Sequence, residues 1–548
     1  MIASVALAFA LALPQDSLAP RRLDDFERIT AWSAHPADGV RMSLHSDPGR
    51  RGRALRLDFA FAAGGGYAIA RRALPIDLPT NYAFSFWMKG SAPPNTLEFK
   101  LIDSTAENVW WYTERDRAFD GGWHRITIRK RQIAFAWGPR GGGELTHLAA
   151  LELVITAGRG GGSGSVWFDD LELTPLADLG PYLGTPVASA DAALAGHAAA
   201  ALVDGDSTTA WRAGVSLRPV AVTLDFGRPR EFGGLSLAWE PGREARDYDV
   251  LLSNDRRTWH LVRRVQTGVG GTHHLYLPDS ESRYVRLVCR SIGAHGVGLR
   301  EVTVQPLEFG ASRNAFFASV ARTAAPGTYP RAFLGQRAYW TIIGSDGSRA
   351  KALLNEDGAV DAGAGAFSLE PFLEDSGLVT WHDVTRSVRL EDGYLPVPSV
   401  EWTTPRRGAL RLAITGWIAG PAERPSLVVR YRVTNRGSTA RRPTLYVAIR
   451  PFQVNPPWQF LGTPGGTARI DSIRWTGSAL VVNGDRRVIP LRAPARVGAT
   501  TFDQGEIGER LRQGIPPTAS AVRDTSGAAS AVLAYPLALA PGDSADVA

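Results

Sequence analysis

The sequence predicts an all-β protein built from antiparallel β-sandwiches. Glycine and proline account for 58 and 36 of the 548 residues, and they favour short strands joined by turns over long helices. Large apolar side chains alternate with other residues in many segments, among them 82–88, 125–129 and 427–433. Helical periodicity is weak throughout, and only the alanine-rich stretch 190–203 favours a turn or a short helix.

The composition is that of a folded protein with a single cysteine. Hydrophobic residues make up 44% of the chain, which excludes disorder as its main state. Cys289 excludes an intramolecular disulfide, and its place in an alternating strand favours a buried structural thiol. The formal net charge is +7, but acidic residues lie between the arginines, so no nucleic-acid partner is expected. Codon bias and an acidic polysaccharide ligand explain the arginine excess equally well.

The two ends of the chain bear on export and completeness. Residues 1–20 begin with an apolar run that resembles a secretory signal, with a buried strand or a disordered tail as alternatives. No other segment approaches the ~18 apolar residues of a membrane span, so a secreted or periplasmic protein is expected. Residues 544–548 follow a Pro-Gly-Asp turn and begin a new strand pattern, which predicts a fragment of something longer.

The first segment, residues 21–177, contains an aromatic run that predicts sugar binding. Trp110, Trp111 and Tyr112 are consecutive, and successive strand side chains point to opposite faces, so at least one ring should face outward. An outward ring beside charged residues suits a sugar, whose C–H face stacks on aromatic rings. The alternative is that both faces of the strand are covered.

The same segment opens with Asp-Phe-Glu at 25–27 and closes with Val-Trp-Phe-Asp-Asp-Leu at 166–171. These ends resemble the galactose-binding-like jelly rolls of carbohydrate-binding modules. In such modules the first and last strands often share a structural calcium. The resemblance therefore implies Glu27 and Asp169 as its ligands, and carboxylate oxygens suit Ca²⁺.

The second segment, residues 185–308, carries five landmarks in order. They are Ala-Leu-Val-Asp-Gly-Asp-Ser-Thr-Thr-Ala-Trp at 201–211, Val-Thr-Leu-Asp-Phe-Gly at 222–227, Tyr-Asp-Val-Leu-Leu-Ser-Asn-Asp at 248–255, Arg-Tyr-Val-Arg-Leu at 283–287 and Leu-Arg-Glu-Val at 299–302. Together they resemble the discoidin, or coagulation factor 5/8 type C, domain. The resemblance implies a jelly roll, and bacterial members are mostly carbohydrate-binding modules.

The first of these landmarks predicts a cation site. Asp204 and Asp206 flank a glycine that permits a sharp bend, which brings several oxygen atoms round one point. The resemblance implies a structural calcium at Asp204, Asp206, Thr209 and Glu301. The alternative is an Asp-Gly-Asp turn closed by its own side-chain hydrogen bonds, which needs no metal.

Sugar contacts in this family come from variable loops, so no motif identifies them. Trp239, Arg243 and Arg246 surround a Pro-Gly turn and are the candidate carbohydrate contacts of the second segment. Trp211 and Trp259 are expected in the core.

The third segment, residues 309–548, combines alternating strands with proline-dense loops at 394–402 and 450–458. Proline removes a ladder donor, so these loops are not central strands. The second loop is expected to present Arg450, Gln453, Asn455 and Trp458 to something outside it. With Trp340, Trp381 and the turn 355–358, the pattern resembles the β-supersandwich that precedes the helical toroid of several glycosidase and sugar-phosphorylase families. The resemblance implies docking of a helical catalytic domain onto residues 309–548.

No catalytic motif is complete in the sequence. The histidines show no H-E-x-x-H spacing, and no G-x-S-x-G elbow occurs. Glycoside hydrolysis needs a converging carboxylate pair, and the sequence alone does not pair the acids of the third segment. Those acids are Glu370, Glu374, Asp375, Asp383, Glu401 and Asp503.

These observations predict two jelly-roll β-sandwiches followed by a large β-supersandwich. The expected function is the carbohydrate-binding and scaffolding portion of an exported glycan-processing enzyme, a glycoside hydrolase or phosphorylase, with a poly- or oligosaccharide as partner. One alternative is a non-enzymatic secreted lectin or adhesin. The other is an enzyme whose site lies in the third segment.

Overall fold

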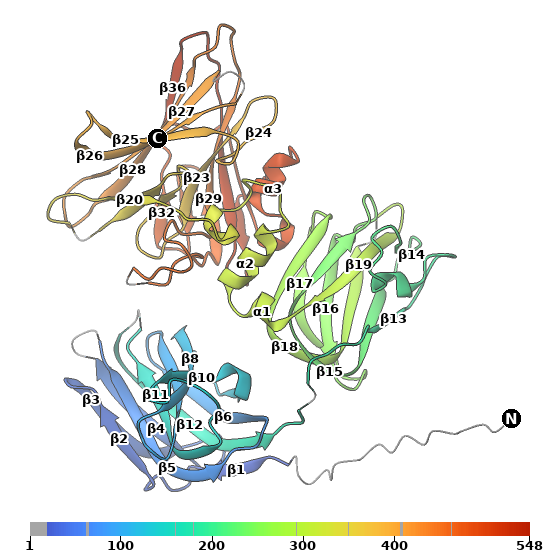
Figure 1. The fold of residues 1–548 in the computed structure, drawn as a ribbon, viewed down its shortest axis with the longest axis vertical. Coiled ribbons are helices and arrows are strands. Elements are labelled where there is room, and N and C mark those ends of the chain that lie inside the picture. The colour runs from blue at the N-terminus through green and yellow to red at the C-terminus, as the bar shows by residue number, and fades with distance from the viewer. Residues whose placement is uncertain are drawn as a thin grey trace. The chain divides into compact units, whose positions relative to one another are not determined.

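The computed structural model describes residues 19–61, 65–158, 161–178, 180–291, 293–348, 350–405, 409–461 and 463–548. In these ranges the chain is almost wholly β-structure with antiparallel strand pairs, which confirms the predicted fold class (Figure 1). It divides into two compact units, Met1–Tyr182 and Leu183–Ala548, while the finer domain boundaries stay predictions. Of the signal-like segment 1–20, residues 1–18 lie outside the described part. None of the helices in that part is long and apolar enough to cross a membrane.

The first unit is a sandwich of two six-stranded sheets. One sheet contains β1 (Arg21–Asp24), β3 (Val40–Pro48), β4 (Arg53–Phe61), β6 (Tyr82–Ser91), β9 (His124–Arg129) and β12 (Gly162–Pro175). The other has the order β10 (Ala134–Trp137), β8 (Val109–Arg117), β7 (Asn95–Ile102), β11 (His147–Thr156), β5 (Tyr67–Asp77) and β2 (Trp32–Pro36), with a 3-10 turn η2 (Lys130–Gln132) before β10.

The core of this unit lies between its two sheets. The predicted alternation of β6 is confirmed, because Tyr82, Phe84, Phe86 and Met88 are all buried. Phe84 meets Phe99 of the other sheet with ring centroids 5.1 Å apart. Apolar residues of both sheets therefore form one cluster, and the alternate residues of β7 and β11 face away from it.

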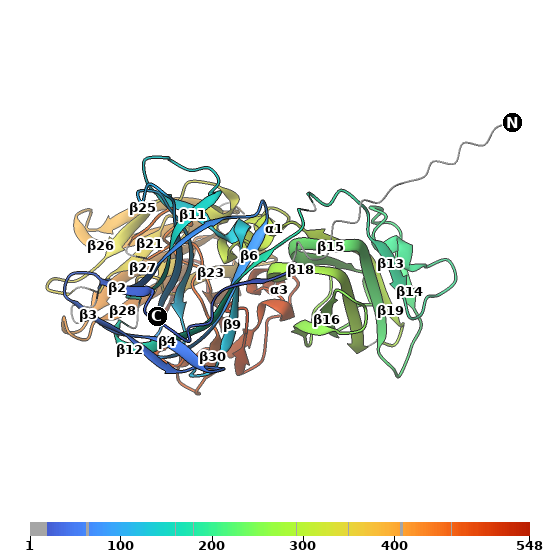
Figure 2. The same ribbon diagram turned by 90° about the horizontal axis from the view of Figure 1, so that it is seen from below.

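The second unit begins with a seven-stranded sheet. Its strands are β13 (Val187–Ala190), β14 (Trp211–Ala213), β15 (Val220–Trp239), β16 (Asp247–Ser253), β17 (His260–Val265), β18 (Thr272–Ser291) and β19 (Val297–Gln305). The predicted short helix is the 3-10 turn η3 (Ala199–Leu202). The long strands β15 and β18 run side by side, as Figures 1 and 2 both show. The ladder breaks after Asp225 and again after Phe232, which lets β15 bend.

Short helices connect this sheet to the rest of the unit. They are α1 (Leu307–Gly310), α2 (Arg313–Ala321) and η4 (Arg331–Leu334). A Cβ on Gly233 of β15 would lie 2.4 Å from the Gly310 nitrogen, so glycine permits the close approach of α1. Arg263 of β17 also forms a buried ion pair of 2.6 Å with Asp503, in the 3-10 turn η5 (Phe502–Gln504). These contacts explain why residues 183–548 form one compact unit.

Three further sheets follow. An eight-stranded sheet contains β20 (Trp340–Ile343), β21 (Ala352–Asn355), β22 (Val360–Asp361), β23 (Ser368–Glu374), β24 (Leu378–Val379), β29 (Thr444–Arg450), β33 (Arg496–Thr500) and β35 (Ser530–Pro536). A five-stranded sheet contains β25 (Thr385–Glu391), β26 (Leu395–Thr403), β27 (Leu410–Ala419), β28 (Ser426–Asn435) and β36 (Ser544–Val547). A four-stranded sheet contains β30 (Ser472–Trp475), β31 (Leu480–Val482), β32 (Arg486–Val488) and β34 (Ala521–Arg523), and the helix α3 (Ile507–Arg512) follows η5.

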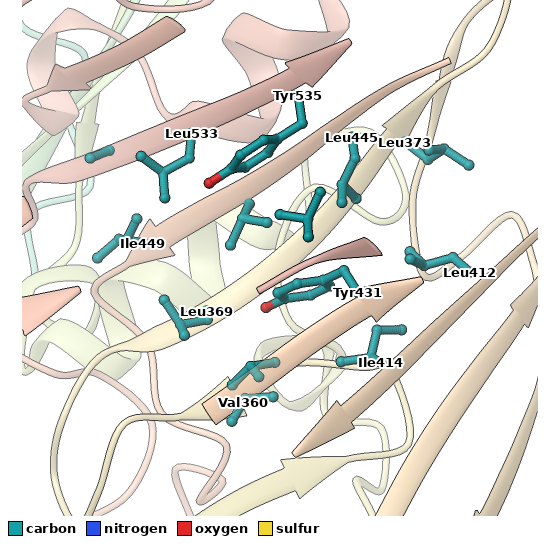
Figure 3. Packing of buried hydrophobic residues seen from close by; sticks show 14 of the residues in the cluster. Val360, Leu369, Leu373, Leu412, Ile414, Tyr431, Leu445, Ile449, Leu533 and Tyr535 are labelled. Atoms are coloured by element: carbon teal, nitrogen blue, oxygen red, sulfur yellow. The ribbon is translucent and has the colours of Figure 1, made fainter. Parts of the chain in front are cut away.

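The eight- and five-stranded sheets contribute most of a large apolar cluster. Figure 3 shows side chains of β29 and β35 meeting those of β27 and β28. The predicted alternation of 427–433 is observed, because Val429, Tyr431 and Val433 are buried while Arg432 is exposed. β36 pairs with β28, so residues 544–547 are a strand as predicted.

Candidate functional site

The strongest candidate binding surface lies on one face of the sheet β10-β8-β7-β11-β5-β2. The strand register places one residue of each strand in a row across this sheet, because directly opposed residues share a face. The row consists of Ala134, Trp111, Lys100, Glu152, Arg71 and Ser33. Adjacent residues such as Leu101 and Leu153 belong to the core, so the row faces away from it.

Aromatic rings surround the Lys100 ammonium group on this face. Its Nζ lies 5.2 Å from the ring centre of Trp137, 5.8 Å from that of Tyr67 and 5.9 Å from that of Trp111. The two indole rings pack edge to face with centroids 5.6 Å apart. Trp137 is 47% exposed and Tyr67 is 42% exposed. We call these four residues the Lys100 platform.

Two buried carboxylates flank the platform. Glu98 Oε2 lies 3.0 Å from Lys100 Nζ, and Arg71 Nη1 lies 3.7 Å from Glu152 Oε1. Burial raises the pKa of Glu152, although the charges of Lys100 and Arg71 oppose that rise. Carboxylates accept hydrogen bonds from hydroxyl groups, ammonium and guanidinium groups donate them, and aromatic rings stack on C–H groups. The face therefore combines the groups that recognise a sugar ring.

The structure separates the three aromatic residues predicted as sugar contacts in this unit. Trp111 lies on the platform. Trp110 is 3% exposed, its Nε1 donates to the Gly143 carbonyl oxygen at 2.9 Å, and its ring packs on Phe135. Trp110 is thus a core residue, because it points to the opposite face from its neighbour. Tyr112 is half-buried and packs against the same core.

Sequence reasoning missed most of the platform. Tyr67 and Trp137 belong to strands that are distant from Trp111 along the chain. One signal was present: Glu98 and Lys100 alternate with apolar residues in β7, which marks an outward face with unusual charge. The sequence did not indicate which aromatic residues would lie across the neighbouring strands.

The two residues predicted to hold calcium in the first unit bind one loop. Glu27 Oε1 accepts a hydrogen bond of 3.1 Å from the Arg53 amide, and Asp169 Oδ2 accepts one of 2.8 Å from the Arg50 amide. Asp169 is 1% exposed, and burial raises its pKa. The structure therefore brings both carboxylates to the loop between β3 and β4.

The second predicted calcium set lies around the loop after η3. Asp204 Oδ2 accepts from Thr209 Oγ1 at 2.8 Å, and Asp206 Oδ1 accepts from the Thr208 amide at 2.9 Å. These are the metal-free bonds of the alternative interpretation. Within the described ranges, no group of three or more His, Cys, Asp or Glu side chains is arranged to hold a metal ion.

In the described part of the chain, Glu301 of β19 nevertheless has a carboxylate oxygen without a partner beside that loop. Its Oε2 is buried and has no hydrogen-bond partner among the residues that the structure describes. Burial raises the pKa of Glu301, while a hydrogen bond from the Gly205 amide lowers it and the Asp204 charge raises it further. An orphaned buried oxygen beside a second carboxylate fits an oxygen-seeking cation.

The three predicted sugar contacts of residues 185–308 occupy different environments. Trp239 is 3% exposed and packs on Tyr248 with ring centroids 5.3 Å apart, so it is a core residue. Arg243 is half-buried and donates to the His295 carbonyl oxygen. Arg246 is exposed. The structure gives no reason to group them as one contact surface.

The expected core residues of this segment are mostly confirmed. Trp211 is fully buried, while Trp259 is half-buried beside Tyr284. Cys289 is a buried free thiol, and burial raises its pKa to about 12. It is therefore a structural residue, as predicted.

The four residues singled out in the proline-dense loop 450–458 lie in three different environments. Arg450 is fully buried and bonds Glu370 and Glu506, so the prediction that the loop presents it outward is wrong. Gln453 and Asn455 line a pocket. Trp458 is 57% exposed.

The six carboxylates considered for catalysis each have a partner within the fold. Glu370 bonds Arg450, Glu374 accepts from Tyr446, Asp375 pairs with Arg441, Asp383 accepts from Thr380, Glu401 pairs with Arg411 and Asp503 pairs with Arg263. Such pairing is typical of structural carboxylates.

Comparison with known proteins identifies the second segment. The F5/8 type C domain model matches residues 187–302, so the chain contains the discoidin domain that its landmarks predicted. The two-sheet first unit fits the galactose-binding-like jelly roll. A search of curated proteins finds no match to the chain.

Three solved structures that resemble parts of the chain come from bacteria. Chitosan-binding module 2 of a chitosanase/glucanase from Paenibacillus sp. IK-5, in complex with chitotriose, is 25% identical, with 22% of this chain and 96% of that chain covered and a TM-score of 0.21. The family 11 carbohydrate-binding module of the cellulase Lic26A-Cel5E of Clostridium thermocellum is 19% identical, with 29% and 96% covered and a TM-score of 0.25. CpGH89CBM32-5 from Clostridium perfringens, in complex with GalNAc-β-1,3-galactose, is 19% identical, with 22% and 94% covered and a TM-score of 0.21.

Proposed function

We propose that the first unit binds an oligo- or polysaccharide on the Lys100 platform. The observation that carries this proposal is the cross-strand row in which Trp111, Lys100 and Glu152 are neighbours on the sheet face that points away from the core. Trp137 and Tyr67 extend the aromatic surface on either side of the ammonium group. A site on a sheet face can contact the interior of a sugar chain as well as its end, so we expect a polysaccharide as the ligand.

Affinity electrophoresis of the full chain tests this proposal. Gels would contain hydroxyethyl cellulose, β-glucan, galactomannan or alginate. We expect at least one polysaccharide to retard the protein, and we expect Trp137→Ala and Trp111→Ala to weaken binding by up to roughly tenfold, since an aromatic contact contributes about 0.5–1.5 kcal/mol.

Trp123→Ala is the matched control for these variants. Trp123 also lies beside a lysine, 5.0 Å from Lys89 Nζ, but it precedes β9 of the other sheet. The Trp123→Ala variant should bind polysaccharide as tightly as the wild type. Retardation by no glycan, or equal retardation of the wild type and both platform variants, would overturn the proposal.

We infer that this chain is the carbohydrate-binding and scaffolding portion of an exported glycan-processing enzyme, which is secreted or periplasmic. The helical catalytic domain of that enzyme would dock onto residues 309–548. The discoidin domain and the large sandwich that follows it support this assignment. A secreted lectin or adhesin is the alternative. The gene sequence downstream of the codon for Ala548 discriminates them: a helical, acid-containing extension supports the enzyme, and an immediate stop codon supports the lectin.

Structural calcium completes the proposal. Asp204, Asp206, Thr209 and Glu301 would hold one ion, and Glu27 and Asp169 a second. The orphaned oxygen of Glu301 supports the first ion, and the convergence of Glu27 and Asp169 on one loop supports the second. A bound cation would tie these loops to the neighbouring strands.

A further inference from the structure

We propose that a pocket in the third segment binds a neutral sugar unit, independently of the Lys100 platform. The pocket has a volume of about 590 Å³, within the range of small-molecule sites. Its walls come from β20, β21, the turn after β22, the β27–β28 hairpin and the loop at 453–455. This site lies in a different unit from the platform and uses different residues.

Two buried amide side chains line this pocket. Gln453 is 7% exposed and Asn455 is 3% exposed. Gln453 Nε2 donates to the Pro464 and Thr467 carbonyl oxygens at 2.9 and 2.7 Å. Asn455 Nδ2 donates to the Gln459 carbonyl oxygen at 3.3 Å. Because carbonyl oxygens only accept, these bonds decide which end of each amide is nitrogen.

The amide oxygens are left without partners. Gln453 Oε1 and Asn455 Oδ1 are both buried, and neither has a hydrogen-bond donor in the part of the chain that the structure describes. A buried acceptor without a donor costs about 1–3 kcal/mol. Because both side chains line the pocket, a ligand with hydroxyl donors would lie beside two amides whose oxygens lack donors among the described residues.

The charges of the pocket disfavour a cationic ligand. Asp361 is 1% exposed, and burial raises its pKa to about 8, so this carboxyl group is mostly protonated at neutral pH. Arg486 Nη1 donates to the Ala362 carbonyl oxygen at 2.9 Å, and Lys351 also lines the pocket. Two cations beside a neutral acid repel an ammonium group or a metal ion.

The remaining lining completes the choice of ligand. Trp340, Ile418 and Leu427 supply an aromatic and aliphatic wall that suits the C–H face of a sugar ring. A carboxylate would add acceptors beside the two amide oxygens, which already lack donors. A neutral polyhydroxylated ring satisfies both the acceptors and the wall.

Saturation-transfer NMR on the full chain tests this pocket. The chain would carry Trp137→Ala, to weaken the platform, and the probes would be glucose, galactose, mannose, N-acetylglucosamine, cellobiose and lactose. Ala364→Trp places a large ring in the pocket lining from an exposed position, so folding should be preserved. Ala440→Trp, also exposed but outside the pocket lining, is the control.

We expect saturable binding of at least one neutral sugar, weakened at least tenfold by Ala364→Trp and unchanged by Ala440→Trp. Binding of no neutral sugar overturns the proposal, and so does binding that survives Ala364→Trp, which would place the sugar on the discoidin domain or elsewhere. Tighter binding of glucuronate or glucosamine overturns the neutral class. Failure of the platform is read separately, from Trp137→Ala in the polysaccharide gels.

Discussion

Arg450 Nη1 donates a hydrogen bond of 2.7 Å to Glu370 Oε2 in the interior of the eight-stranded sheet. A second acid, Glu506, binds Nη2 of the same guanidinium and also caps α3, where its Oε2 accepts from the Gly508 amide at 2.6 Å. Burial alone would lower the pKa of Arg450, but the two carboxylates raise it above its usual value. One buried cation therefore joins β23, β29 and α3.

Replacement of this cation should be severely destabilising. Arg450→Met is expected to lower the free energy of unfolding by about 3–5 kcal/mol, because two buried carboxylates lose their partner. Arg432→Met is the control, since Arg432 pairs with Asp546 at 2.7 Å on the surface and such pairs contribute about 0–1 kcal/mol. Urea denaturation followed by circular dichroism measures both, and equal losses would contradict the structure.

Two tryptophans of the first unit should respond oppositely to truncation. Trp110→Ala is expected to cost about 3–5 kcal/mol of stability, because it removes a core ring. Trp137→Ala should change stability by no more than about 0.5 kcal/mol, since its ring lies at the surface. Calorimetric melting checks the pair. A large loss for Trp137→Ala would mean that its ring supports the fold instead of a ligand.

Chelation tests the proposed calcium at Glu301. We expect EDTA to lower the melting temperature of the wild type and added Ca²⁺ to restore it, since a ligand at 100 times its Kd stabilises by about 2.7 kcal/mol. Glu301→Gln should reduce the shift, because its orphaned carboxylate oxygen would bind one of the two proposed ions and the ion at Glu27 and Asp169 would remain. The exposed Glu423→Gln should keep it. A chelator-insensitive wild type would favour the metal-free turn.

Asp361 should make stability depend on pH. Its pKa of about 8 in the folded state lies above the ordinary value of 3.8, so the folded protein holds a proton that the unfolded chain releases. The free energy of unfolding should therefore fall as pH rises from about 4 to 8, by up to about 1.4 kcal/mol per pH unit from this group.

Asp361→Asn should flatten this profile, because amide and protonated acid are both neutral. Asp485→Asn, at an exposed position, should leave it unchanged. Burial also raises the pKa of Glu509, to about 7, so this group lowers the stability with rising pH in both variants. Urea midpoints measured from pH 4 to 9 give the slopes, and parallel profiles for wild type and Asp361→Asn would refute the assignment.

Cys289 should be chemically silent in the folded protein. Its burial keeps the thiol protonated, and only the thiolate reacts with disulfide reagents. We expect no modification by Ellman's reagent under native conditions and one equivalent in urea. Rapid labelling under native conditions would show that the thiol is accessible and that β18 is not buried as described.

Much of the fold was predictable because strand alternation is a local property. The pattern at 82–88 identified the buried face of β6, and the five ordered landmarks identified the discoidin domain. The candidate site was predictable only in part. Trp111 was named, but Trp110 and Trp239 are core residues, and Arg450 serves an internal ion pair.

The sequence by itself determined the class of this protein: an all-β chain with a discoidin domain and one buried thiol. Only the tertiary structure decided which outward residues meet. Alternation assigns each side chain to a face, but strand order and register choose its neighbours across the sheet. Lys100 meets Trp111 because β7 pairs with β8, and Trp137 joins them because β10 lies at the edge of the same sheet. That pairing is long-range, so no local pattern encodes it.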